Sequence, residues 1–260
     1  MLDIENPLRF DGRIVLTDDH RYVLDGNLAA PLSVTKLIEQ QCSEPFDERA
    51  IVLKNLSSWR RRSSSKFHDV VVGLTDEQAL EAVGAMWAAT AKEGTSLHRQ
   101  LELVCNGEPP ESPERHAAEL RQFSEIRAAN PALAPFRTEL SLVATDDVGR
   151  PVLGGQLDLL VKDPNGNFHI VDFKRTDKDL DKNVHDFGRK LLGFPDNAHH
   201  RYSLQCSLYA AMLESQEGIF VESMSVLQVH PNLPAGCLTR LTDMRREARM
   251  LVDGLRRSTF

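Results

Sequence analysis

The sequence lacks several features that mark common protein classes. Its four cysteines, Cys42, Cys105, Cys206 and Cys237, include no Cys-x-x-Cys pair, which disfavours a zinc ribbon and a disulfide framework. We therefore expect four reduced, buried thiols. No N-terminal apolar run resembles a signal peptide, and no run approaches the length of a membrane span. The sequence thus predicts a soluble, intracellular protein that does not act on membranes, with nucleus, organelle and cytoplasm equally open.

An excess of basic charge is also missing. The 260 residues carry a formal net charge of −7 and a pI near 5.7, which excludes a broadly basic coat for nucleic acid. A local cationic cleft remains compatible with this balance, because a bound divalent ion cancels carboxylate charge. With 41% hydrophobic residues, the chain can bury a full core as one domain with additions.

Residues 154–174 carry the main chemical signal of the sequence. Two runs of apolar, branched residues, 154–161 and 168–174, flank the turn sequence Pro164-Asn165-Gly166, and this pattern predicts a β-hairpin. The first run begins with two glycines, which allow another backbone or a ligand to approach closely.

Both predicted strands carry acidic residues where a core strand would not. Asp172 and Lys174 are two residues apart and leave the same face of the strand, whereas Val171 and Phe173 point to the opposite face. Asp158 comes from the partner strand. Two carboxylates beside one ammonium suit a hard cation and a polarised water. A surface ion pair on a sheet edge is the alternative.

Helices and strands alternate along the rest of the chain. Apolar periodicity, capping residues and prolines predict the boundaries, with Thr75 and Gln78 forming a capping box. The expected strands are a small hairpin over residues 13–24 and single strands over 137–145 and 220–230; the expected helices are 33–42, one from Pro45, one from Thr75, and 112–130, 200–216 and 241–257.

Three further groups of residues are candidates for function. His98 and Glu102 share one helical face, as do Gln205 and Tyr209, because each pair is four residues apart. Alone, each pair is also typical of an ordinary hydrogen bond on a solvated helix. The low-complexity stretch 57–66 contains Arg60, Arg61, Arg62 and Lys66 beside Trp59. It could bind phosphates and stack on a base, or form a solvated loop.

The order of these elements and motifs resembles the PD-(D/E)XK nuclease superfamily. It is most similar to the RecB-like branch, which includes the RecB nuclease domain, the CRISPR-associated exonucleases and the mitochondrial genome-maintenance exonuclease. Four motifs carry the resemblance, in the order of the family: Gly94-x-x-x-His98-x-x-x-Glu102, Gly155-x-x-Asp158, Asp172-Phe173-Lys174 and Gln205-x-x-x-Tyr209.

The resemblance implies an α/β fold with a restriction-endonuclease-like αβββαβ core and a mixed central sheet. We expect a hairpin and helical addition over residues 1–92, the nuclease core over 93–232 and a C-terminal helix over 233–260. Two departures stand out. The threonine that usually follows the lysine is replaced by Arg175 or displaced to Thr176. The cysteine cluster of the iron–sulfur members is missing, so we expect no iron–sulfur cluster.

The resemblance also implies an activity. The implied enzyme is a DNA nuclease that needs Mg²⁺ or Mn²⁺ and leaves a 5′-phosphate and a 3′-hydroxyl. The partner would be single-stranded DNA or duplex ends, and the sequence does not indicate an oligomeric state. The implied metal ligands are His98, Asp158, Asp172 and the carbonyl of Phe173. Lys174 would act on the water, which Asp172 would help to orient, and Glu102 would orient His98 or an outer-shell water. The implied DNA contacts are Gln205, Tyr209, Arg175, Arg60, Arg61 and Arg62.

Other activities remain open at this level. An exonuclease in replication, recombination or repair and a nonspecific endonuclease of a virus or mobile element share these motifs. A binding module that kept the fold and lost turnover would bind DNA without metal and without cleavage. A hydrolase of another substrate is less favoured, because the sequence contains no phosphate-cradling glycine-rich loop.

Overall fold

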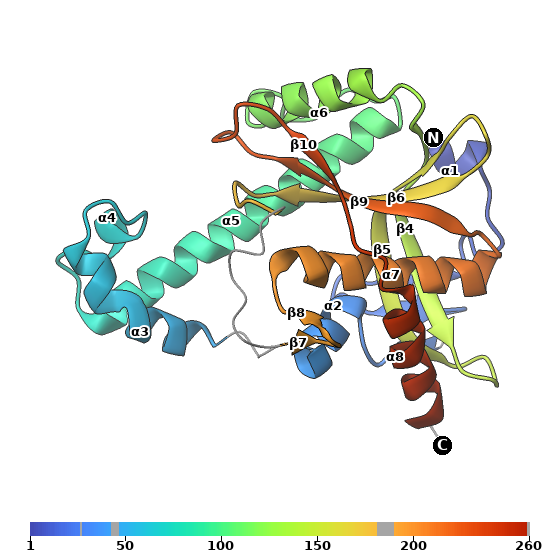
Figure 1. Cartoon of the computed structure of the whole chain (residues 1–260), viewed down its shortest axis with the longest axis horizontal. Helices are drawn as coiled ribbons and strands as arrows, with labels where there is room; N and C mark the ends of the chain where they lie inside the picture. Colours follow the sequence, from blue (N-terminus) through green and yellow to red (C-terminus); the bar gives the residue numbers. More distant parts are fainter. Residues whose placement is uncertain (27, 43–46, 181–189, 259–260) are drawn as a thin grey trace. The chain divides into compact units, whose positions relative to one another are not determined.

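A computed structural model describes residues 1–26, 28–42, 47–180 and 190–258 (Figure 1). The helices are α1 (Leu2–Glu5), α2 (Val34–Leu37), α3 (Glu48–Arg61), α4 (His68–Val71), α5 (Asp76–Cys105), α6 (Ala117–Ala129), α7 (Ala198–Glu217) and α8 (Arg245–Ser258), with a π-helical segment η1 (Ile38–Cys42). The strands are β1 (Ile14–Leu16), β2 (Tyr22–Leu24), β3 (Leu28–Ala29), β4 (Ala134–Thr145), β5 (Pro151–Lys162), β6 (Phe168–Arg175), β7 (Lys190–Leu191), β8 (Phe194–Pro195), β9 (Val221–Val229) and β10 (Cys237–Arg240).

A five-stranded mixed sheet in the order β10-β9-β6-β5-β4 forms the centre of the fold. Strands β4, β5 and β6 are antiparallel neighbours, whereas β9 runs parallel to β6. The parallel pair requires a crossover connection, and α7 lies within it. The end of α5, the three strands, α7 and β9 therefore confirm the predicted αβββαβ order. Helix α6 precedes β4, and β10 is an edge strand that the sequence did not predict.

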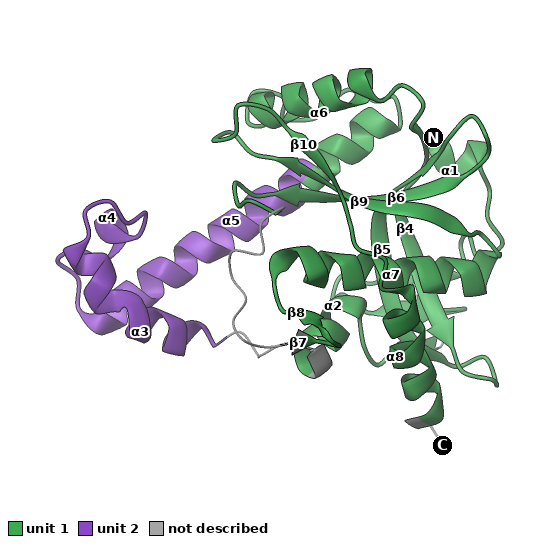
Figure 2. Cartoon of the chain, viewed as in Figure 1, with its two compact units in different colours: residues 1–43, 98–260 green, residues 44–97 purple. Residues whose placement is uncertain are grey.

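The chain divides into two compact units (Figure 2). Residues 1–43 and 98–260 form the first, and residues 44–97 form the second. This division differs from the predicted one, because the N-terminal hairpin and α2 belong with the nuclease core rather than with a separate addition. The C-terminal residues also belong to the first unit, where α8 packs against α7.

The turn between β5 and β6 forms as the sequence predicts. The Asp163 side chain accepts hydrogen bonds from the backbone N–H groups of Asn165, at 2.9 Å, and Asn167, at 2.8 Å. Gly166 has a φ of +89°, a conformation that glycine adopts without steric cost. These contacts set the register in which Leu160 faces Ile170.

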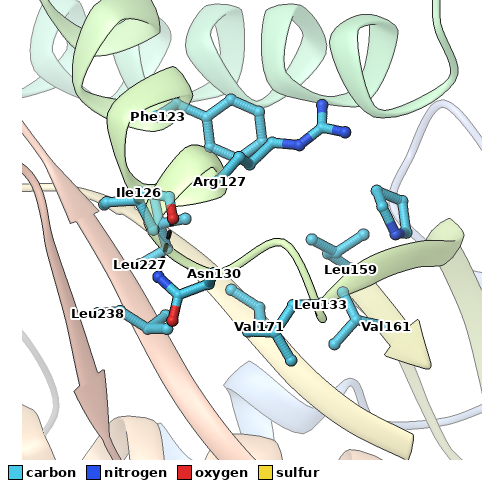
Figure 3. Close-up of a pocket in the computed structure, with 11 residues that line it drawn as sticks. Phe123, Ile126, Arg127, Asn130, Leu133, Leu159, Val161, Val171, Leu227 and Leu238 are labelled. Atoms are coloured by element: carbon cyan, nitrogen blue, oxygen red, sulfur yellow. Dashed lines mark hydrogen bonds between the residues drawn. The ribbon is translucent and has the colours of Figure 1, made fainter. Parts of the chain in front are cut away.

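The sheet buries its two faces in different ways. On one face, α7 and α8 contribute to a large apolar core that includes Leu204, Met212 and Val252. On the other, α6 covers the sheet and leaves a cavity of about 30 Å³ (Figure 3), which has room for a few water molecules at most. Its lining is mainly apolar, so we exclude it as a substrate site; the lining residues are Phe123, Ile126, Arg127, Asn130, Leu133, Pro135, Leu159, Val161, Val171, Leu227 and Leu238.

The second unit is helical, and its caps follow the sequence. Thr75 Oγ1 accepts from the Gln78 N–H at 3.3 Å, while Gln78 Oε1 accepts from the Thr75 N–H at 3.0 Å, which is the predicted capping box. Helix α3 begins at Glu48 with Asp47 as its cap, later than predicted, and Pro45 lies outside the described residues. Trp59 stacks on Phe67 with ring centroids 4.0 Å apart.

Two predictions from the composition concern the cysteines and the membrane-spanning helices. Cys105 and Cys206 are buried, but Cys237 is exposed, so the expectation of buried thiols is wrong for this residue, which lies on an edge strand. The Cys42 side chain lies outside the described part of the chain. None of the described helices has both the length and the apolar composition needed to cross a membrane.

The paired glycines of β5 allow two tyrosine rings to pack against the sheet. A Cβ atom at Gly154 would lie 2.5 Å from Tyr22, and one at Gly155 would lie 2.6 Å from Tyr209 Cε1 and 3.0 Å from Val34 Cγ2. The close approach that the sequence predicts at these positions is therefore made by side chains of the same protein.

The Gly155→Ala substitution should lower the free energy of unfolding by about 1–3 kcal/mol, because its methyl group overlaps the Tyr209 ring. Gly254→Ala in α8 provides the control. Apart from its own helical backbone and chain neighbours, no atom of the described residues lies within 4 Å of the Cβ it would add, so the gain in helix propensity should stabilise the protein by about 0.5–1 kcal/mol. Chemical denaturation of both variants measures the difference. Equal stability of the two would contradict the packing described here.

Candidate metal and catalytic site

The site lies where β5 and β6 separate. These strands pair from Lys162 and Phe168 as far as Leu159 and Val171, but β6 continues beside β9 through Arg175. Past Val171, the backbone of β6 therefore has no strand partner on its β5 side. The Asp158 carboxylate takes the place of that strand, because its Oδ2 accepts the Phe173 N–H at 2.7 Å.

The regular alternation of β5 also breaks at this point. Leu157 and Leu160 are three residues apart, yet both lie in the core cluster that contains α7. In an uninterrupted strand they would point to opposite faces. On β4, Glu139 lies opposite the break and has a φ of +46°, a strained conformation for a residue with a side chain. The irregularity places the Asp158 and Glu139 carboxylates together.

His98, in the last third of α5, closes the site from a third element. Its Nε2 lies 2.9 Å from the Phe173 carbonyl oxygen, and its Nδ1 lies 3.4 Å from Asp158 Oδ1. Both ring nitrogens thus face oxygen acceptors, which suits a protonated imidazole. Burial opposes this charge, but the Asp158 carboxylate outweighs burial and raises the pKa of His98.

Glu139 is the site residue that the sequence reasoning missed. One ligand atom each from His98, Glu139 and Asp158 lies within 4.8 Å of the other two. Glu139 Oε1 is buried, and no described residue gives it a hydrogen bond. Imidazole and carboxylate groups so arranged can hold a divalent cation. The signal in the sequence was an acid in the strand that pairs with the strand of Asp158.

The carboxylates of the site have unequal pKa values. Burial, aided by the charge of Asp158, raises the pKa of Glu139 to about 8. Burial also raises the pKa of Asp172, to about 6, against the opposing effect of Lys174. For Asp158, burial acts in the same direction, but His98 and Lys174 overcome it and hold the pKa below its usual range.

Asp172 and Lys174 form an ion pair beside this cluster, with Asp172 Oδ2 2.7 Å from Lys174 Nζ. Asp172 is 3% exposed and does not belong to the group of three ligand atoms described above. The Lys174 ammonium lies 5.0 Å from the centre of the Tyr202 ring on α7. Burial disfavours the ammonium, but Asp172 and Asp158 raise the pKa of Lys174 well above its usual range.

The structure thus brings together His98, Asp158, Asp172, Phe173 and Lys174, all predicted from the sequence. Glu102 is placed differently, since its carboxylate pairs with Arg99 at 2.8 Å. On α7, Gln205 Nε2 donates to the Tyr209 hydroxyl at 3.0 Å, and Tyr209 is 5% exposed.

The residues predicted to bind DNA outside the cluster have varied environments. Arg175 Nε donates to Glu119 Oε1 at 2.8 Å, and Glu119 is 2% exposed. This buried pair gives a structural reason for an arginine after Lys174. In the helical unit, Arg60 bonds the Asp76 carboxylate and the Leu74 carbonyl, both at 2.8 Å. Arg61 and Arg62 are exposed at the end of α3.

The chain matches one family of known proteins. A family model for the PD-(D/E)XK nuclease superfamily matches residues 63–253. Among solved structures, the chain is similar to SSO0001, with 13% identity, a TM-score of 0.38 and coverage of 86% of this chain and 74% of that one. It is also similar to a candidate exonuclease from Eubacterium rectale, with 12% identity, a TM-score of 0.39 and coverage of 88% and 82%. No curated protein matches the sequence.

In the metal-free protein, the raised pKa values predict a stability that falls as the pH rises from 5 to 8. The folded state keeps a proton on Glu139 up to a pH of about 8, whereas the unfolded chain releases it near its ordinary value of 4.5. Asp172 and His98, whose pKa values are also raised, act in the same direction. The lowered pKa of Asp158 matters only below its ordinary 3.8.

Glu139→Gln should flatten this pH dependence, and Glu108→Gln, at an exposed position, should leave it unchanged. Urea denaturation in EDTA at several pH values measures the slope. A Glu139→Gln slope equal to that of the wild type would show that the buried Glu139 carboxyl does not hold the extra proton.

Proposed function

Because this chain belongs to the PD-(D/E)XK nuclease superfamily, we propose that its site hydrolyses phosphodiester bonds of DNA. The observation that carries the proposal is the convergence of His98, Asp158 and Lys174 from three separate elements onto the gap between β5 and β6. Members of the superfamily are nucleases that use divalent metal ions. We further propose membership of the RecB-like branch, on the motif order described above, with a 5′-phosphate and a 3′-hydroxyl as products.

The residues at the gap fit a divalent cation. The buried Glu139 oxygen lacks a hydrogen-bond donor among the described residues, and the Phe173 carbonyl faces the same imidazole that contacts Asp158. His98, Glu139, Asp158 and the Phe173 carbonyl would hold the ion, and their hard oxygens favour Mg²⁺ or Mn²⁺. A bound ion of this kind lowers the pKa of water and polarises phosphoryl oxygens.

Lys174 is the group best placed to act on the reacting phosphate. Its raised pKa keeps it protonated, so it serves as a donor that orients the attacking water and offsets negative charge developing on the phosphate. Asp172 holds the ammonium at 2.7 Å and limits its rotation. We assign Asp172 this positioning role, and we keep as a separate proposal, from the resemblance alone, that it also binds the ion beside the ligands named above.

Glu102 and the pair on α7 have supporting roles in this proposal. The Glu102 carboxylate adds negative potential near Glu139 and would orient groups around the bound ion. The Gln205 side chain is half-buried and holds the Tyr209 hydroxyl, so Gln205 is the member of the pair better exposed for contact with a nucleotide. The Arg175 guanidinium pairs with Glu119, which largely cancels its charge, so it is suited to holding this part of the site in place rather than to binding DNA directly.

The helical unit would supply further contacts to DNA. Arg61 and Arg62 are exposed in a stretch that contains Lys66 and no acid between Glu48 and Asp69. Exposed basic side chains of this kind neutralise phosphates without reading sequence. The hydrogen bonds of Arg60 to Asp76 and Leu74 suit it to a structural role.

The substrate is proposed to be a DNA end or single strand, which the likeness to the exonucleases of the RecB-like branch supports. Incubation of the purified protein with linear and circular single-stranded DNA, in Mg²⁺, Mn²⁺ or EDTA, tests this. We expect degradation of the linear form with either metal and none in EDTA. Rapid cleavage of the circular form would instead identify an endonuclease.

Lys174→Ala should reduce the rate of cleavage by about two orders of magnitude or more, because it removes a preorganised charge from the transition state. Binding of Mn²⁺, measured by calorimetry, should remain. Lys162→Ala is the matched control, since Lys162 lies at the exposed end of β5. A Lys174→Ala enzyme as active as the Lys162→Ala control would contradict the assignment.

The Arg61→Ala/Arg62→Ala double variant should bind DNA more weakly at all sequences. Each lost phosphate contact should reduce the slope of log K against log salt by about 0.7 for single strands. Arg240→Ala/Arg246→Ala, which removes two exposed arginines from the other unit, controls for net charge. Fluorescence anisotropy across a salt series measures both. Identical slopes for the two double variants would exclude a specific contribution of the helical unit.

A further inference from the structure

The N-terminal segment packs against the strand that carries Asp158, although it lies outside the family match. The match covers residues 63–253, whereas residues 1–43 form one compact unit with the core. Strand β2 of the small N-terminal sheet lies against both β4 and β5. It carries Tyr22, the first residue of the strand.

Tyr22 packs directly on the strand that carries Asp158. A Cβ atom at Gly154 would lie 2.5 Å from the Cβ, Cγ and Cδ2 atoms of Tyr22, so the ring fits only because this position is glycine. The segment after β3 is also fixed there, since the Gly154 N–H donates to the Leu32 carbonyl at 2.9 Å. Tyr22 thus has a defined position on β5.

The alternation of side chains along β5 places the contact between Tyr22 and Gly154 on the face of the strand that carries Asp158. Gly154, Gln156 and Asp158 occupy alternate positions before the break in β5 and share one face. Gln156 Nε2 donates to the Glu139 carbonyl at 3.0 Å, which joins this row to the strained residue of β4. The acidic groups that act on Tyr22 are Glu139 and Asp158.

The Tyr22 hydroxyl has no hydrogen-bond partner in the described part of the chain, although the side chain is half-buried. A phenol that is partly removed from water normally finds a partner. Burial and the nearby carboxylates raise the pKa of Tyr22 to about 12, so the group stays neutral and can donate.

We propose that the Tyr22 hydroxyl donates a hydrogen bond to a phosphate oxygen of the nucleic-acid substrate. The proposal rests on the nuclease function proposed above and adds a contact from outside the matched family region. A neutral donor is suited to this place, because the neighbouring carboxylates repel the phosphate and an O–H group brings it a favourable contact without adding charge. The N-terminal hairpin would then serve the site as well as the fold.

Tyr22→Phe is the decisive variant, because it removes only the hydroxyl and keeps the ring on Gly154. We expect kcat/KM for cleavage of linear single-stranded DNA to fall about 10-fold to 100-fold, the loss of one hydrogen bond to a charged group. The melting temperature and the half-saturating Mn²⁺ concentration should stay at the wild-type values. Wild-type kcat/KM in Tyr22→Phe would overturn the proposal, and so would a loss explained entirely by weaker metal binding.

Gly154→Ala gives a second, independent test. Its methyl group displaces the Tyr22 ring and should produce a loss of kcat/KM at least as large. Adding Tyr22→Phe to Gly154→Ala should then cost little more, because both changes remove one contact. Full additivity of the two losses would count against the proposal, and Tyr22→Phe alone decides the matter if Gly154→Ala does not fold.

Lys174→Ala, assayed on the same DNA, separates this proposal from the function on which it rests. Cleavage that depends on Lys174 but not on the Tyr22 hydroxyl would reject the contact and keep the nuclease. Absence of metal-dependent cleavage by the wild-type protein would reject the nuclease itself.

Discussion

The hydrogen bond from the Phe173 N–H to the Asp158 carboxylate is the interaction on which the site depends. Strands β5 and β6 part beyond Leu159 and Val171, and a bare gap would leave the Phe173 backbone unpaired inside the protein, at a cost of about 1–3 kcal/mol. Asp158 satisfies the N–H, and His98 faces the carbonyl. The backbone that the sheet no longer pairs thereby becomes part of a polar site.

Much of the fold and most of the site residues could be predicted from the sequence. The hairpin around Gly166 and the capping box at Thr75 are local signals, because neighbouring residues supply both partners of each contact. The spacing of Asp172 and Lys174 likewise places both on one face of a strand, and the structure pairs them at 2.7 Å. Features within one element are thus readable from periodicity and turn chemistry.

The rest depends on contacts between distant segments. Glu139 alternates with other polar residues in its strand, so its sequence resembles that of a solvated strand, and only the break opposite Asp158 buries it. The sequence around Arg175 gives no sign of a partner for its charge, because that partner, Glu119, comes from α6, a distant segment of the chain. The grouping of residues 1–43 with residues 98–260 likewise depends on contacts between distant segments, such as the packing of Tyr22 on Gly154.

The charges of the site balance one another within the protein. Several carboxyl groups meet in a small volume, and their mutual repulsion is relieved in three ways: Glu139 keeps its proton, His98 becomes protonated, and Lys174 balances Asp172. A divalent cation can replace the proton on Glu139 and the proton on His98, because it binds an ionised carboxylate and a neutral imidazole. Metal binding should therefore release protons from Glu139 and His98. The site is then a set of buried groups that exchange protons for a metal while the backbone around Phe173 stays in place.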